Sequence, residues 1–201
     1  MLRITSVLFA AALLAQPAEA GVMYKWHQTS ASEMMPAGMH LELEFSDAAV
    51  KQGRLNLDID TACWMGECID PQDSLLALRF WFNEAGEDGG VIRRSYINYR
   101  YREWPQNGYG DTISLDLTFM PGGLLSGSVR ANDTNSDFWV QSAGSTFEVI
   151  RTASDGGPCS FEYPECSGEL GQLRAEVPEP SSAAIAGLGL LAAWFGRRRR
   201  R

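Results

Sequence analysis

The pattern that most resembles a binding surface is a run of aromatic residues interleaved with polar ones between residues 93 and 109. The aromatic members are Tyr96, Tyr99, Tyr101, Trp104 and Tyr109, and the polar members are Arg93, Arg94, Asn98, Arg100 and Arg102. Aromatic rings stack on the apolar faces of sugars, and polar groups beside them can bond the hydroxyls. On a strand, alternation would turn Ile97, Tyr99 and Tyr101 toward the core. The candidate glycan-binding residues are then Tyr96, Asn98, Arg100, Arg102 and Trp104.

The sequence gives little support for a catalytic function. The histidines His27 and His40 have no nucleophile arranged with them, and the chain holds no G-x-S-x-G, H-E-x-x-H or phosphate-binding glycine loop. Acid pairs such as Asp58 and Asp60 are the residues that a glycosidase would use. Their alternate spacing, however, is typical of the solvated face of a strand. We therefore predict no catalytic residue and no cofactor.

Two patterns raise the question of a metal ion. Residues 133–137, Asp-Thr-Asn-Ser-Asp, offer oxygen ligands at alternate positions, as calcium loops do. Phe138 then stands where such a loop needs glycine, and Gly144 where it needs glutamate. The cysteines could instead suggest zinc, but neither close pair is C-x-x-C and no histidine lies near. We predict polar turns and no metal site.

The cysteines occur as two close pairs, Cys63 with Cys68 and Cys159 with Cys166. In an exported protein they meet an oxidising compartment, in which disulfides persist. Four cysteines allow three pairings, which the sequence alone does not separate. Local pairing is favoured because each pair brackets a turn-rich loop.

The periodicity between residues 21 and 178 is that of strands. In residues 41–45, 55–59 and 113–119 apolar side chains alternate with polar ones, so one face packs in a core and the other meets water. Residues 75–82 are apolar on both faces, which predicts a central strand, and a helical turn is expected near residues 47–51. Further strands are expected at residues 22–28, 92–102, 125–131, 138–141, 147–152 and 173–177.

Many short strands separated by Gly-, Asn- and Asp-rich turns predict an all-β fold, an antiparallel β-sandwich resembling a jelly roll. Residues 21–178 number 158, the length of one domain. They hold 11 Lys plus Arg against 23 Asp plus Glu, so their net charge is 11 − 23 = −12. Because phosphate contact needs a basic face, this composition disfavours nucleic acid as a partner.

The first twenty residues have the parts of a secretory signal peptide. Arg3 supplies the positive start, residues 7–14 are apolar, and Ala18-Glu19-Ala20 forms an A-x-A cleavage site. The apolar run is too short to span a bilayer, so we expect signal peptidase to cleave after Ala20. The expected organisation is a signal peptide at 1–20, a β-sandwich body at 21–176 and a C-terminal segment at 177–201.

The C-terminal segment has three parts in a fixed order. Pro178, Glu179 and Pro180 come first, and residues 181–196 are almost wholly apolar. A helix of this apolar stretch would be about 24 Å long, just under the bilayer core of about 30 Å. Five arginines close the chain, and such a cluster stays on the cytoplasmic side. They are Arg197, Arg198, Arg199, Arg200 and Arg201.

This order resembles the PEP-CTERM sorting signal, although an ordinary tail anchor is the alternative. In that family exosortase, a membrane protease of bacteria that make exopolysaccharide, recognises the Pro-Glu-Pro motif, here Pro178, Glu179 and Pro180. The tail is also labelled "ice-binding protein C-terminal", but the body shows no threonine ladder. The resemblance implies passage through the secretion machinery, transient anchoring in the inner membrane with the body outside, and release to the surface or medium.

Three hypotheses for the body follow. The first is a non-enzymatic structural or adhesive β-sandwich at the cell surface or in the extracellular matrix. The second is a carbohydrate-binding module for exopolysaccharide that uses the hairpin of residues 96–109. The third is an unrecognised hydrolase, which a buried pair of carboxylates in a cleft would favour.

Overall fold

The computed structural model describes residues 21–35, 38–61, 68–85, 91–103, 110–133, 136–154, 159 and 166–176. The predicted signal peptide and the predicted sorting segment at 177–201 lie outside this part of the chain. The described residues form ten strands and a short helix. The strands are β1 (Gly21–Ser30), β2 (Met39–Ser46), β3 (Arg54–Asp60), β4 (Leu75–Ala85), β5 (Val91–Arg100), β6 (Thr112–Met120), β7 (Leu124–Asp133), β8 (Ser136–Ala143), β9 (Thr146–Ser154) and β10 (Leu170–Ala175).

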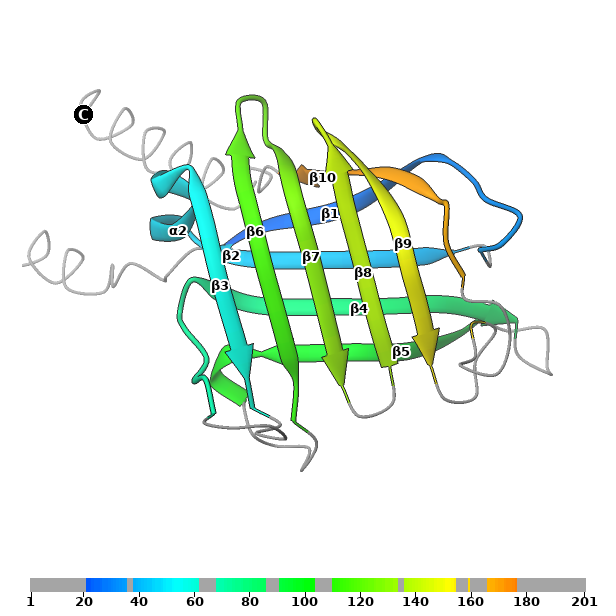
Figure 1. Cartoon of the computed structure of the whole chain (residues 1–201), viewed down its shortest axis with the longest axis horizontal. Coiled ribbons are helices and arrows are strands. Elements are labelled where there is room, and N and C mark those ends of the chain that lie inside the picture. The colour runs from blue at the N-terminus through cyan, green and yellow to red at the C-terminus, as the bar shows by residue number, and fades with distance from the viewer. Residues whose placement is uncertain are drawn as a thin grey trace, which may run out of the picture.

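The ten strands belong to one antiparallel sheet in the order β3-β6-β7-β8-β9-β10-β1-β2-β4-β5. Figure 1 shows this sheet folded into two layers, with β3, β6, β7, β8 and β9 in front and β1, β2, β4 and β5 crossing behind them. Strand β10 joins the layers, because it pairs with β9 at Leu170 and Gly171 and with β1 along most of its length. We call these the front and back layers.

The all-β antiparallel body expected from the sequence is confirmed, and every expected strand is present. The jelly-roll arrangement is not what the strand order shows. Strands β6 to β10 are consecutive neighbours, which is an up-and-down arrangement, whereas a jelly roll is built from two Greek keys. Tight turns such as Gly122-Gly123 and Gly144 join neighbouring strands, so these connections have no length to cross the sheet.

The core lies between the two layers. Alternate side chains of β2, β3 and β6 are buried, as the periodicity predicted, and aromatic rings meet across the gap. Phe80 on β4 stacks on Phe138 of β8 with ring centroids 4.3 Å apart. Phe119 of β6 lies edge-on to Phe45 of β2 at 5.2 Å. Burial of these rings supplies the main stabilising term of the fold.

A short helix, α2 (Asp47–Gln52), connects the back layer to the front layer. The Ser46 hydroxyl caps its first turn by accepting a hydrogen bond from Ala49 N at 3.3 Å. Gly53 ends it with φ 77°, a left-handed conformation that glycine adopts without strain. The helical turn expected near residues 47–51 is therefore confirmed.

One glycine is required within a strand. Gly127 of β7 has φ 124°, and a Cβ atom there would overlap the carbonyl oxygen of Asp116 on the neighbouring strand β6. Glycine thus allows β6 and β7 to keep their pairing at this point.

The structure shows the disulfide between Cys159 and Cys166, with Cα atoms 5.4 Å apart. This local pairing was predicted. Cys68 is also disulfide-bonded, whereas Cys63 lies outside the described residues. The pairing of Cys63 with Cys68 therefore stays a prediction.

We expect replacement of Cys159 and Cys166 by alanine to lower the free energy of unfolding by about 2 kcal/mol, because the bridge closes only a short loop. Urea unfolding of the variant and the parent measures this difference. Non-reducing peptide mapping of the parent should also find Cys63 joined to Cys68. A bridge between Cys68 and either cysteine of the second pair would show that local pairing is wrong.

Candidate binding groove

A ladder of polar side chains crosses the outer face of the back layer. The strand register places Lys25, Glu42, Arg79 and Asn98 in one row across β1, β2, β4 and β5. Glu42 lies between two cations, with Lys25 Nζ 3.6 Å and Arg79 Nη2 2.7 Å from its carboxylate oxygens. This row fixes the Arg79 guanidinium on the outer face at the centre of the layer.

Beside this row the surface is hollowed into a groove of about 460 Å³. Its walls come from β2, β4, the end of β5 and the single turn η1 (Tyr101–Glu103). The lining residues are Glu44, Leu76, Ala77, Arg79, Arg100, Tyr101, Arg102 and Glu103. We call this hollow the arginine groove, because three of its lining side chains end in guanidinium groups.

The register explains why these residues meet. Ala77 of β4 lies opposite Glu44 of β2 on one side and Arg100 of β5 on the other. The small side chain of Ala77 leaves the floor low between two longer ones. At the end of β5 the chain turns into η1, and Arg100 Nη1 donates to Glu103 Oε1 at 3.0 Å. This contact links the end of β5 to η1.

The groove gathers three arginines within an acidic body. Arg79, Arg100 and Arg102 line it together with Glu44 and Glu103, whereas residues 21–178 carry a net charge of 11 − 23 = −12. Arg79 uses Nη2 to bind Glu42, and its buried Nε–H has no hydrogen-bond acceptor among the described residues. The half-buried ring of Tyr101 lies in the same wall. Guanidinium groups beside an aromatic ring suit a sugar that carries a carboxylate.

The structure separates the residues of the predicted glycan-binding face. Ile97 and Tyr99 are buried, each 1% exposed, so the alternative that they pack in the core is confirmed. Asn98, Arg100 and Arg102 are exposed, and the last two line the groove. The side chain of Tyr96 and the whole of Trp104 lie outside the described part, as do Pro178, Glu179, Pro180 and the arginines 197–201.

Sequence reasoning missed Arg79 and Glu44. Each lies on a strand far from residues 96–109 in the chain and reaches the groove only through cross-strand pairing. The outward position of Arg79 between Leu78 and Phe80 was the available signal, because it is the one charged residue in the otherwise apolar run of residues 75–82.

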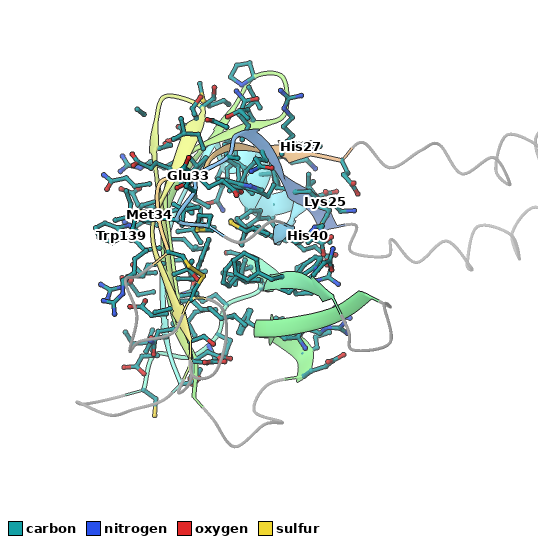
Figure 2. All side chains as sticks on the ribbon, turned by 90° about the vertical axis from the view of Figure 1, so that its right-hand side faces the viewer. Lys25, His27, Glu33, Met34, His40 and Trp139 are labelled. Atoms are coloured by element: carbon teal, nitrogen blue, oxygen red, sulfur yellow. A yellow bond between two sulfur atoms is a disulfide. The ribbon has the colours of Figure 1, made fainter. Side chains whose placement is uncertain are left out.

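The histidines and acid pairs that were considered for catalysis lie apart from the groove lining. His40 stacks on the Trp81 ring at 4.8 Å and contacts Asn83 at 2.7 Å. Figure 2 shows His40 with Lys25 and His27 on the outer side of the back layer. Within the described ranges, no group of three or more His, Cys, Asp or Glu side chains is placed to hold a metal ion.

A pair of carboxylates lies at the adjoining ends of β6 and β7. Asp111 precedes the Thr112–Asn132 pair of the two strands, and Asp133 follows it. Burial, and then the negative charge of Asp133, raises the pKa of Asp111 to about 6 from 3.8. Burial likewise raises the pKa of Tyr99, whose hydroxyl has no hydrogen-bond partner among the described residues. The backbone of Asp111 is held by Thr61, which accepts from its amide at 2.6 Å.

This pair predicts a pH-dependent stability. A raised carboxyl pKa means that the folded chain binds a proton that the unfolded chain has lost, so stability falls as pH rises between 3.8 and about 6. Asp111→Asn should raise the free energy of unfolding at about pH 8 and lose that advantage at about pH 4. Urea unfolding at both pH values measures this difference in the free energy of unfolding, with the exposed carboxylate variant Asp58→Asn as the control. The same difference between Asp111→Asn and the parent at both pH values would contradict this assignment.

Comparison with known proteins gives one match. Residues 176–201 match the family model described as the PEP-CTERM protein-sorting motif. No curated protein and no solved structure matches the chain. The tail therefore carries the sorting motif that its residues resembled. This motif indicates an exported protein that is processed by exosortase, a membrane protease. Among the residues that the structure describes, no helix is long and apolar enough to cross a membrane.

Proposed function

We propose that this chain is an exported, non-enzymatic adhesive protein whose body binds carboxylated polysaccharide outside the cell through the arginine groove. The observation that carries the proposal is the groove itself, which Arg79, Arg100 and Arg102 line together with the partly exposed Tyr101. The exopolysaccharide that the sorting motif led us to expect is the natural ligand in this proposal. Signal peptidase, the secretion machinery and the inner membrane are transient partners.

The chemistry of the groove favours an acidic sugar over a neutral one. A guanidinium group can form two parallel hydrogen bonds to one carboxylate, and such charge-assisted bonds are stronger than those to hydroxyls. The body's overall negative charge would repel an acidic polymer elsewhere on its surface. In this proposal, binding is therefore concentrated where the three arginines gather.

The test is a titration of the full-length protein with alginate, a carboxylated polysaccharide. Arg100→Ala with Arg102→Ala should weaken binding at the groove by at least about tenfold, since two charge-assisted contacts are lost. Arg174→Ala is the matched control, because this exposed arginine lies on β10 and bonds Gln172 at 2.6 Å instead of lining the groove. Equal binding by the double variant and the parent would refute the role of the groove.

A second candidate, a hydrolase, is favoured by the coupled carboxylates Asp111 and Asp133. The arginine groove does not include either residue, so the pair has no described cleft to serve. Release of new reducing ends from alginate, abolished by Asp111→Asn, would favour this candidate over adhesion.

A further inference from the structure

The outer face of the front layer carries a second aromatic residue between arginines. The register places Arg130 of β7, Trp139 of β8 and Arg151 of β9 in one row. Phe138 and Val140, on either side of Trp139 in the chain, are buried, so the Trp139 side chain lies on the opposite, outer face. Figure 2 shows Trp139 on the outside of the front layer, away from Lys25 and His40.

Trp139 differs from the two other tryptophans that the structure describes. Trp26 donates its indole N–H to Glu169 at 2.8 Å, and Trp81 is 8% exposed beneath the ring of His40. The partly exposed Trp139 has neither a hydrogen bond nor a ring contact within the described residues. The part of the Trp139 ring that is exposed on the outer face is costly to hydrate and can contact a ligand.

One acidic side chain lies near both flanking arginines. Asp137, two residues before Trp139 on the same strand, is 6% exposed. Its carboxylate lies 3.9 Å from Arg130 Nε and 3.5 Å from Arg151 Nε. One carboxylate thus lies near two guanidinium groups. The Arg130 side chain is 60% exposed, so its guanidinium group can reach a ligand beside the Trp139 ring.

We propose that Trp139, Arg130 and Arg151 form a second binding site for carboxylated polysaccharide, so that a single body cross-links two polymer chains. The ring stacks on the apolar face of a sugar, and the arginines bind its carboxylate. This inference rests on the proposed function of the arginine groove. It adds a second site with the same chemistry, and two sites allow one body to cross-link two polymer chains, which one site cannot do.

The two sites lie on opposite outer faces. Arg79 and Lys25 both contact Glu42 on the back layer, and Figure 2 places Lys25 and Trp139 on opposite sides of the fold. Five of the 11 Lys and Arg side chains of residues 21–178 are at these sites, three in the groove and two beside Trp139. A single polymer segment cannot lie on both faces at once, so the second site recruits another segment.

The experiment uses the full-length protein with one copy held in each lipid nanodisc. Each particle can then bind two polymer segments only if a single body carries both sites. Alginate is the carboxylated probe, neutral dextran is the comparison, and light scattering reports cross-linking. As the parent protein is titrated into alginate, the scattering should rise to a maximum. At excess protein it should fall again, because each polymer segment then has its own protein molecule and no two segments share one. Trp139→Ala should bind its second segment about tenfold more weakly and abolish the maximum, while alginate binding through the groove persists.

Matched variants separate the second site from general damage. Trp139→Phe keeps a stacking ring and should retain the maximum, whereas Arg130→Gln leaves the ring intact and should reduce it. Arg54→Ala removes an exposed arginine from β3 of the same layer and should change nothing.

The outcomes are distinguishable. A scattering maximum that survives both Trp139→Ala and Arg130→Gln would overturn the second site and leave the groove unaffected. Equal cross-linking of dextran would overturn the assignment of a carboxylated ligand. If the parent binds no alginate at all, the proposed function fails and this inference fails with it.

Discussion

Replacing Phe80 by alanine should lower the free energy of unfolding by about 3–5 kcal/mol, a large part of the total stability of a domain of this size. Phe80 is 1% exposed and stacks on Phe138 of the front layer at 4.3 Å. It also meets Phe82 of its own strand at 5.4 Å. Removing the ring leaves a cavity where the two layers meet, and strands paired on both sides cannot close it.

Urea unfolding followed by circular dichroism measures this loss. Trp139→Ala is the matched control, because it removes a ring of at least equal size from an outer face instead of from the core. It should cost clearly less than Phe80→Ala, because the Trp139 ring is partly exposed and its removal leaves no cavity between the layers. Equal losses for the two variants would contradict the assignment of the core to the space between the layers.

The second large effect concerns the sorting motif. Glu179→Ala with Pro180→Ala should abolish release of the protein in its native host, so that uncleaved chain accumulates in the membrane fraction. The apolar stretch of residues 181–196 and the arginines after it are unchanged, and insertion should therefore proceed normally. The change removes only the acidic residue and the rigid proline that precede the apolar stretch.

Immunoblotting of membrane, surface and medium fractions measures the distribution. Ser181→Ala with Ser182→Ala is the control, since it alters two neighbouring residues and leaves the Pro-Glu-Pro motif intact. The parent and this control should lose the arginine-rich end and leave the membrane. Release of the Glu179 and Pro180 variant at the parent's level would mean that hydrophobicity, and not the motif, controls processing.

The strands could be predicted because the sequence records burial along one strand directly. Leu41, Leu43 and Phe45 alternate with polar residues, and all three are buried in β2. The order of the strands could not be predicted, since it depends on pairing between distant segments. Strand β10, at the end of the described chain, pairs with β1 at its beginning, and no local pattern indicates this.

The same distinction applies to the candidate sites. Arg100 and Arg102 were predicted because they lie within one aromatic-rich segment, whereas Arg79 joins them only through the register of β4 with β5. Trp139 was missed for the same reason. In the sequence it follows Phe138 in a short apolar run, and its arginine neighbours come from two other strands.

The central claim is that export delivers this body to an extracellular polymer that the arginine groove binds. Its most direct test is to fractionate host cultures into cells, extracellular polymer and cleared medium, and to quantify the body in each by immunoblotting. The account predicts that the parent is found mainly with the polymer. The Arg100→Ala and Arg102→Ala double variant should shift in part to the cleared medium, because it keeps only the Trp139 site. Identical distributions of the parent and the double variant across the three fractions would contradict it.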